Sequence, residues 1–308
     1  MTETEPLAGV ALAISAFRSD EPVLRLLRAA FAPDQPRFGA VIVVDSLGSG
    51  AIEETAGREG WPIRYVNSES NLGSAGNLDL RLRTAAGLGL EWCLALNHDG
   101  ELDPGKVLRL VAHGRSRPKV GAVYPQMLFS RAGGRPDSPR RSFAPYTLIA
   151  QRPEPSGGCV EVVWSSSNGA LYNLDPIREG VGAWPELWMG YEDLAIGWEL
   201  QRRGWSQLLC TDVTVSDDYE FRPVRVFGRT LHLAEKPSWY SYYQSRNLLL
   251  IGRRTKRSAI GAFSIVVRTL VDFGTILLFR DAKRERLRLM TRGLKDGMRN
   301  LTGKGPVP

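Results

Sequence analysis

Three short stretches near the start of the chain decide its fold: VALAIS at residues 10–15, PVLRLLRAA at 22–30 and AVIVV at 40–44. The first and third are apolar runs of strand length, and the middle stretch repeats apolar residues at helical spacing. The pattern predicts a strand, a helix and a second strand that ends at Asp45.

The same alternation continues along the chain. Further strands are predicted at 63–66, 92–96 and 160–164, and a helix at 193–203 ends at Gly204. Strands that alternate with helices of this length favour right-handed crossovers and a mostly parallel α/β sheet of Rossmann-like form, flanked by helices. Ligands of such sheets bind beyond the carboxyl ends of the strands, so we expect polar residues at those ends to form the site.

Composition and charge restrict the class of protein. The 308 residues are 43% hydrophobic and 24% charged, as in globular proteins, and the formal net charge is +7. The positive charge gathers after Arg253, without interleaved aromatic residues or a nucleic-acid motif, so no nucleic-acid partner is expected. The first six residues lack the basic start and apolar run of a secretory signal, which predicts a cytoplasmic protein.

The cysteines and histidines suggest neither a disulfide nor a zinc site. Cys93, Cys159 and Cys210 are odd in number, far apart and without a CxxC pair, as expected in a reducing cytoplasm. His98 and His113 have no second histidine or cysteine at ligand spacing.

Asn97 and Asp99 follow the apolar strand at 92–96 and leave the sheet at its ligand-binding edge. A divalent cation such as Mg²⁺ or Mn²⁺ that holds a diphosphate needs oxygen ligands of this kind. The competing interpretation is a turn or capping role for Asp99.

The loop at residues 71–77, NLGSAGN, precedes a predicted helix and consists largely of small residues. Such a loop lets a phosphate or ribose approach backbone amides. It lacks the Gly-Lys-Ser/Thr ending of a Walker loop, and a simple helix cap is the alternative.

Glu192 and Asp193 begin a predicted helix behind an aromatic-rich run at 184–191. A sugar hydroxyl that attacks an anomeric carbon needs a base, and a partly enclosed carboxylate suits that task. Helix capping by Asp193 is the alternative.

Together these motifs resemble the family 2 glycosyltransferases, in particular the bacterial rhamnosyl- and galactofuranosyltransferase-like branch, in order and spacing over most of the chain. The resemblance implies a GT-A fold, an inverting transfer from a dTDP- or UDP-linked sugar, and an acceptor that is a glycan or a lipid-linked glycan. It assigns the base of the nucleotide to Asp45, the rest of the donor to Asn71, Gly73, Gly76, Asn77, Asn97 and Asp99, the acceptor to Asn168, Gly169 and Trp188, and catalysis to Asp193, with Glu192 as the next candidate.

The chain departs from the family pattern in its metal ligands. Where many members end a strand with a metal-binding His, this chain has Asp217, and His232 lies shortly before the Tyr-Tyr-x-x-Arg-Asn segment. Either residue is therefore a candidate metal ligand beside Asp99, and a hydrogen-bonded surface role is the alternative for His232. Asn97 in place of a first Asp predicts modest metal affinity.

The C-terminal part is expected to be a basic helical extension over residues 253–308. Residues 259–279 are apolar, but Arg268 and Asp272 near their centre disfavour a membrane span. A later stripe is surrounded by basic residues, and it predicts contact with an anionic membrane surface, with the domain itself, or with a second copy of the chain. The stripe consists of Leu287, Met290, Leu294, Met298 and Leu301.

The sequence therefore predicts a glycosyltransferase domain at 1–252, with a nucleotide-sugar half at about 1–130 and an acceptor half at about 159–252. The predicted location is the cytoplasm, with peripheral attachment to the inner face of the plasma membrane. Two other functions stay open. A non-catalytic nucleotide-sugar-binding protein would keep Asp45 and Asp99 but lack a working base. A sugar nucleotidyltransferase would need a Gly-rich basic loop after the first strand, where this chain has residues 15–18, SAFR.

Overall fold

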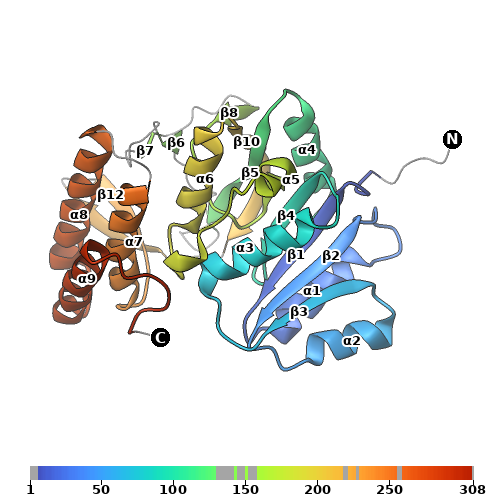
Figure 1. Ribbon diagram of the computed structural model, residues 1–308, viewed down its shortest axis with the longest axis horizontal. Coiled ribbons are helices and arrows are strands. Elements are labelled where there is room, and N and C mark those ends of the chain that lie inside the picture. Colours follow the sequence, from blue (N-terminus) through green and yellow to red (C-terminus); the bar gives the residue numbers. More distant parts are fainter. Residues whose placement is uncertain are drawn as a thin grey trace.

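The computed structural model describes residues 6–129, 142–143, 150–151, 158–217, 221–226, 229–254 and 259–306. Its centre is an eight-stranded sheet of order β3-β2-β1-β4-β9-β5-β10-β8 (Figure 1). The strands, in that spatial order, are β3 (Ile63–Ser68), β2 (Ala40–Ser46), β1 (Val10–Ala16), β4 (Trp92–Asn97), β9 (Ala170–Asn173), β5 (Val120–Phe129), β10 (Ser206–Asp217) and β8 (Cys159–Glu161).

Six strands of the sheet share one direction, as the alternating sequence pattern predicts. β3, β2, β1 and β4 are parallel neighbours, and β5 is parallel to β10. β9 runs antiparallel to both β4 and β5, and β8 runs antiparallel to β10. The predicted mostly parallel α/β sheet is confirmed.

Helices cover both faces of the sheet because the side chains of each strand alternate between the faces. In β1, Leu12 and Ile14 join the apolar core under α1 and α4, whereas Ala11 and Ala13 join the core under α3 and α5. The helices of this part, together with one 3₁₀ turn, are α1 (Asp20–Ala30), α2 (Ala51–Glu59), α3 (Gly73–Ala86), α4 (Pro104–Arg115), α5 (Leu174–Arg178), η1 (Pro185–Leu187) and α6 (Glu192–Arg202).

Three further helices form a group at one end of the molecule (Figure 1). They are α7 (Tyr240–Arg254), α8 (Ala259–Phe279) and α9 (Lys283–Met298), and the short strands β6 (Ser142–Phe143), β7 (Ala150–Gln151), β11 (Phe221–Val226) and β12 (Arg229–Ala234) form two hairpins. Within the described ranges, no helix is long and apolar enough to cross a membrane.

The basic helix has a packing contact within the chain. α9 packs against α7, with Met290 buried and Gly293 so close to α7 that an added Cβ would lie 2.3 Å from the backbone oxygen of Tyr242. Of the predicted stripe, Met290 is therefore an internal contact of this chain, whereas Met298 and Leu301 are exposed.

One prediction about the cysteines is wrong. Cys159 and Cys210 form a disulfide, and Cys93 is a buried free cysteine. The pair forms because antiparallel pairing of β8 with β10 places the two residues directly opposite each other. The two cysteines are 51 residues apart in the sequence, and the sequence pattern does not indicate that their strands pair in this register.

Candidate active site

Asp45 is buried near the carboxyl end of β2. Its Oδ2 accepts a hydrogen bond from the Tyr65 hydroxyl at 2.9 Å, and its Oδ1 is buried without a hydrogen-bond partner among the described residues. Burial raises the pKa of this carboxyl, the Tyr65 hydrogen bond opposes the increase, and the charge of Asp20 adds to it. The site therefore holds a buried acceptor that a ligand N–H can satisfy.

The loop that carries the NLGSAGN motif turns into α3 and packs against the segment before α6. Asn71 Oδ1 accepts from the Gly73 amide at 2.9 Å, and the Ala75 amide donates to the Trp188 carbonyl at 3.2 Å. Gly73 has a φ of +67°, and a Cβ there would lie 2.1 Å from that carbonyl. The small residues thus serve close packing, and the amides of Gly73 and Ala75 are not free to bind phosphate as the sequence suggested.

Asn77 and Gly76 have packing contacts of a similar kind. Asn77 Nδ2 donates to the Val44 carbonyl at 3.0 Å, beside Asp45, while its Oδ1 is buried without a partner in the described part of the chain. A Cβ on Gly76 would meet Leu72 at 3.2 Å. Asn77 therefore ties α3 to the carboxyl end of β2 and adds a second buried acceptor near it.

Arg81 is a buried charged residue that sequence reasoning missed. Its Nη1 donates to the carbonyls of Ala13 at 3.1 Å and Leu96 at 3.0 Å, so α3 is fastened under the carboxyl half of β1 and β4. Burial lowers the Arg81 pKa to about 10, and the charge of Glu192 is among the smaller effects that oppose this shift. The guanidinium stays charged at neutral pH. A basic residue inside the otherwise apolar face of α3 was the available signal.

The end of β4 contacts the segment that contains Asn168 and Gly169, just before β9. Asn168 Oδ1 accepts from the backbone N–H of Asn97 at 3.0 Å, and the Gly169 amide donates to the Ala95 carbonyl at 2.8 Å. Asn97 Oδ1 in turn accepts from the Ser15 hydroxyl at 3.3 Å. The structure therefore brings together Asn97, Asn168 and Gly169, which are about 70 residues apart in sequence.

Asp99 lies just beyond this junction and is exposed. Gly100, the next residue, is buried. A Cβ there would lie 3.1 Å from Asn168 Oδ1, so this turn lies close to the segment before β9. An exposed carboxylate beside an amide fits a hard divalent cation that keeps several waters and diphosphate oxygens. Since Asn97 Oδ1 is already hydrogen-bonded, Asp99 is the main ligand that this turn offers.

Glu192 and Asp193 occupy the first turn of α6, where a helix N-terminus favours carboxylates. Asp193 is partly buried, and its Oδ1 accepts from the Leu194 amide at 2.9 Å. Glu192 Oε2 is buried without a hydrogen-bond partner among the described residues, and the charge of Glu192 acts on the buried Arg81. Both residues are partly buried; one carboxylate oxygen of Glu192 is buried, whereas Asp193 Oδ1 is hydrogen-bonded to the Leu194 amide.

Trp188 is nearly buried, at 5% exposed. Its Nε1 donates to the Asn71 carbonyl at 3.3 Å, and its ring stacks on Tyr243 with centroids 4.8 Å apart. The Gly190 amide donates to the Ser74 hydroxyl at 3.4 Å. Trp188 thus joins the loop at residues 71–77 to the segment that leads into α6. Contact of Trp188 with an acceptor stays a prediction.

α7 holds the same segment from the other side. Asn247 is fully buried, and its amide donates to the carbonyls of Leu187, Met189 and Gly190 at 3.0, 2.8 and 3.0 Å. Arg246, also fully buried, donates to the Leu187 carbonyl at 2.8 Å. Three of the four carbonyls at residues 187–190, before α6, are therefore fixed by side chains of one helix.

The two other candidate metal ligands cannot be placed in the site. Asp217 is the last residue of β10, and His232 lies on β12, paired with Pro223. Their side chains fall outside the part of the chain that the structure describes.

No protein-family model matches the sequence, and no curated protein matches it. Solved structures share its fold. TarS from S. aureus in complex with UDP-GlcNAc has a TM-score of 0.58 at 13% identity, over 95% of this chain and 81% of that chain. The mannosyltransferase PcManGT from Pyrobaculum calidifontis, in complex with GDP-Man and Mn²⁺, has a TM-score of 0.56 at 14% identity, over 94% and 87%. A longer TarS chain has a TM-score of 0.59 at 15% identity. The match covers 94% of this chain and 48% of that TarS chain. The predicted GT-A fold is confirmed by these similarities.

Proposed function

We propose that this chain is an inverting glycosyltransferase. It moves a sugar of the rhamnose or galactofuranose type from a dTDP- or UDP-linked donor to a hydroxyl of a glycan or lipid-linked acceptor. The observation that carries the proposal is the hydrogen bond of 3.2 Å between the Ala75 amide and the Trp188 carbonyl. It places the loop proposed for the donor beside the segment that leads to the proposed base, although the two are more than 100 residues apart. The neighbours that bind UDP-GlcNAc and GDP-Man support the same class of donor.

Asp45 and Asn77 are proposed to hold the nucleoside. Both present a buried oxygen without a hydrogen-bond partner among the described residues, and burying such an oxygen costs free energy unless a ligand satisfies it. The ring N–H of a uracil or thymine base is a donor of the right kind. These acceptors fit the base of the dTDP or UDP that the motifs predict.

Asp99, with Asn97 beside it, is proposed to hold Mg²⁺ or Mn²⁺. When bound, the cation would offset charge on the leaving diphosphate. A neighbour of the same fold is in complex with Mn²⁺. The test is calorimetry of nucleotide diphosphate binding with and without Mg²⁺ or Mn²⁺. We expect Asp99→Ala to abolish the metal dependence, and Asp103→Ala, which removes only the cap of α4, to keep it. Unchanged metal dependence in Asp99→Ala would refute this assignment.

Asp193 is proposed to take the proton from the acceptor hydroxyl as that oxygen attacks the anomeric carbon. A single displacement of this kind inverts the anomeric configuration and releases the nucleotide diphosphate. Glu192 is the less suitable base because its Oε2 is buried and its charge acts on the buried Arg81. The backbone segment before α6 is rigidly held by Asn247 and Arg246, which fixes the position of this carboxylate.

The outer face of α8 is proposed to rest on an anionic membrane surface, where a lipid-linked acceptor lies. Arg268 and Asp272 pair at 3.1 Å, and Gln244 of α7 donates to Asp272 at 3.0 Å, so this polar pair faces α7. Several large apolar side chains of α8 are exposed instead: Phe263, Val266, Leu270, Val271, Phe273 and Leu278. The basic residues Lys283 and Arg284 follow at once and are exposed. An apolar face next to cations suits anionic lipids.

Vesicle sedimentation tests the membrane contact. We expect the chain to bind phosphatidylglycerol vesicles but not phosphatidylcholine vesicles, and the double variant Leu270→Asp, Leu278→Asp to lose binding. Leu88→Asp, at an exposed apolar residue outside α8, is the control and should bind normally. Equal binding by the double variant would refute this role of α8.

A panel of nucleotide sugars, assayed for nucleotide release with and without lipid acceptors, tests the proposed reaction. Acceptor-dependent release from one donor is expected. Nucleotide binding without transfer to any acceptor would instead favour a non-catalytic nucleotide-sugar-binding protein.

A further inference from the structure

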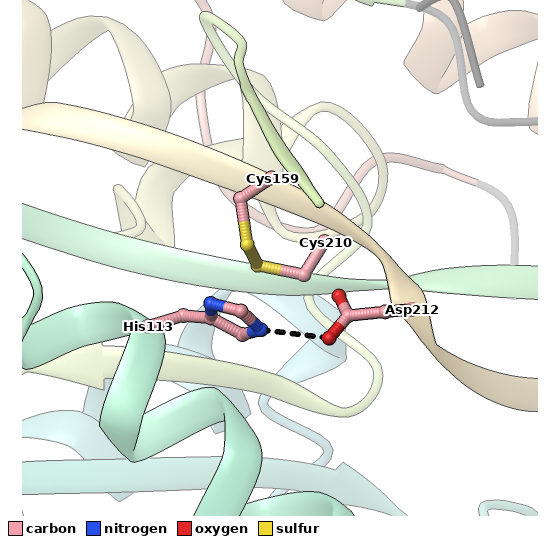
Figure 2. A group of neighbouring side chains, drawn as sticks. All are labelled: His113, Cys159, Cys210 and Asp212. Carbon is pink, nitrogen blue, oxygen red and sulfur yellow. Dashed lines mark hydrogen bonds and ion pairs between the residues drawn. A yellow bond between two sulfur atoms is a disulfide. The ribbon is translucent and has the colours of Figure 1, made fainter. Parts of the chain in front are cut away.

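A second group of ligand-type side chains lies away from the candidate active site. His113, Cys159, Cys210 and Asp212 each offer one ligand atom, and these four atoms all lie within 4.8 Å of one another. Figure 2 shows the histidine and the aspartate on one side of the Cys159–Cys210 pair, with His113 Nε2 2.9 Å from Asp212 Oδ2. The proposed reaction assigns none of these four residues to the binding of nucleotide or sugar.

The backbone explains why they meet. Cys210 and Asp212 are two residues apart on β10, where its pairing with β5 shifts register between Cys210 and Thr214, and both lie on the face toward α4. That face lies under α4, whose residues Arg109 and His113 are one turn apart and both contact Asp212. β8 brings Cys159 opposite Cys210 from the adjacent strand. Three elements, α4, β8 and β10, thus converge on one point.

The chemistry of the group is that of a structural zinc site. Zn²⁺ takes four ligands in a tetrahedron from cysteine sulfur, histidine nitrogen and aspartate oxygen, at about 2.0 to 2.3 Å, so that neighbouring ligand atoms lie about 3.3 to 3.8 Å apart. The four atoms here lie within 4.8 Å of one another, which is near enough for small side-chain movements to bring them to that spacing after the S–S bond breaks. The site is also open to solvent on one side, because His113 and Cys159 are only partly buried and Asp212 is exposed.

We propose that, in the reduced chain, Cys159, Cys210, His113 and Asp212 bind Zn²⁺, so that the disulfide and the zinc ion are alternative cross-links of β8, β10 and α4. A dithiol reduces the disulfide by exchange: the S–S bond breaks, the two cysteine sulfurs gain two electrons and two protons, and the dithiol becomes a cyclic disulfide. Zn²⁺ then displaces the two thiol protons, which pass to solvent. The Arg109 guanidinium, which donates to the Asp212 carbonyl at 3.4 Å, offsets the net negative charge of two thiolates and a carboxylate around Zn²⁺.

This cross-link has a clear place in the fold. β8 is the first strand of the main sheet after residues 130–157, and α4 begins just after the turn that carries Asp99. In a reducing cytoplasm thiols stay reduced, so the zinc form is the one that would hold these elements there. The ion is distinct from the Mg²⁺ or Mn²⁺ proposed at Asp99, since its ligands include soft sulfur.

The test measures zinc content of the full-length chain, purified after reduction with a phosphine and dialysed against trace zinc. We expect a single zinc ion per reduced chain and none in the oxidised chain. X-ray absorption should show two sulfur ligands and two nitrogen or oxygen ligands. Chelation of the zinc should lower the melting temperature of the reduced chain.

Variants separate this site from any other zinc binding. Cys159→Ser with Cys210→Ser should lose the zinc, and Cys93→Ala and Asp99→Ala should both retain it. If the double variant fails to fold, His113→Gln and Asp212→Asn, at sites open to solvent, should lose or strongly weaken zinc binding. A reduced chain without zinc, a site without sulfur ligands, or zinc retained by the cysteine double variant would each overturn the proposal.

Discussion

The side-chain amide of Asn247 donates to the backbone carbonyl of Met189 at 2.8 Å, so α7 fixes the segment that leads into α6. The same amide also reaches the carbonyls of Leu187 and Gly190. A helix outside the main sheet therefore sets the position of Asp193, the proposed base.

Replacement of Asn247 should damage both stability and activity. In Asn247→Asp the side chain can no longer donate, and the carbonyls of Met189 and Gly190 lose this donor at a cost of about 1 to 3 kcal/mol each, whereas the Leu187 carbonyl keeps Arg246. We expect a lower melting temperature and, in the folded fraction, a lower kcat with little change in donor affinity. Arg253→Gln, on the same helix and hydrogen-bonded to the Met298 carbonyl of α9, is the control. A normal kcat in Asn247→Asp would show that the segment needs no support from α7.

Contact between α7 and α9 depends on glycine. A Cβ on Gly293 would lie 2.3 Å from the Ser245 hydroxyl and from the Tyr242 carbonyl, whereas a Cβ on Gly274 in α8 meets nothing within 4 Å. Gly293→Ala should lower the free energy of unfolding by about 1 to 3 kcal/mol through overpacking. Gly274→Ala should raise it by up to about 1 kcal/mol through helix propensity. Chemical denaturation of both variants checks this, and two equal effects would contradict the packing.

Asp45 should make stability depend on pH. Because its folded-state pKa lies above the ordinary value of 3.8, its contribution is present below that value and is lost as the pH rises through the folded-state pKa. At neutral pH the buried carboxylate is therefore unfavourable. Asp45→Asn should melt at a higher temperature than the parent at pH 7, and the gain should shrink as the pH falls toward 4.

The same substitution should weaken nucleotide binding. The amide replaces one of the two carboxylate oxygens with an NH₂ donor, so either the Tyr65 hydroxyl or the N–H of a base would face a donor in place of an acceptor. Asp34→Asn, at an exposed residue, is the control for the change of charge. An Asp45→Asn variant that is less stable at pH 7, or that binds nucleotide as the parent does, would contradict this account of Asp45.

The sequence predicts the first half of the sheet well because its signals are local. Apolar runs that end at Asp45 and Asn97 indicate both the strands and the polar residues at their carboxyl ends. The antiparallel direction of β9, the pairing of Cys159 with Cys210 and the packing of α9 on α7 depend on contacts between distant segments. No periodicity within one segment encodes them.

The candidate site shows the same division. Motif order predicts that Asn97 and Asn168 belong to one site, and their hydrogen bond brings them together. The use of Gly73 for contact with Trp188, and the burial of Arg81 beneath the strands, follow from tertiary packing that a single sequence does not reveal.

Single-turnover transfer by Asp193→Asn tests the central claim most directly. The amide keeps the acceptor oxygen for the Leu194 N–H, so a capping role alone should cost about 1 kcal/mol of stability or less. A general base contributes typically about 10² to 10⁴ in rate, and an amide cannot accept the proton. With the donor identified in the nucleotide-sugar panel, we predict a folded variant that binds donor normally and transfers sugar about 10² to 10⁴ times more slowly, while Glu192→Gln retains far more activity. Transfer by Asp193→Asn at near the parent rate would contradict the account.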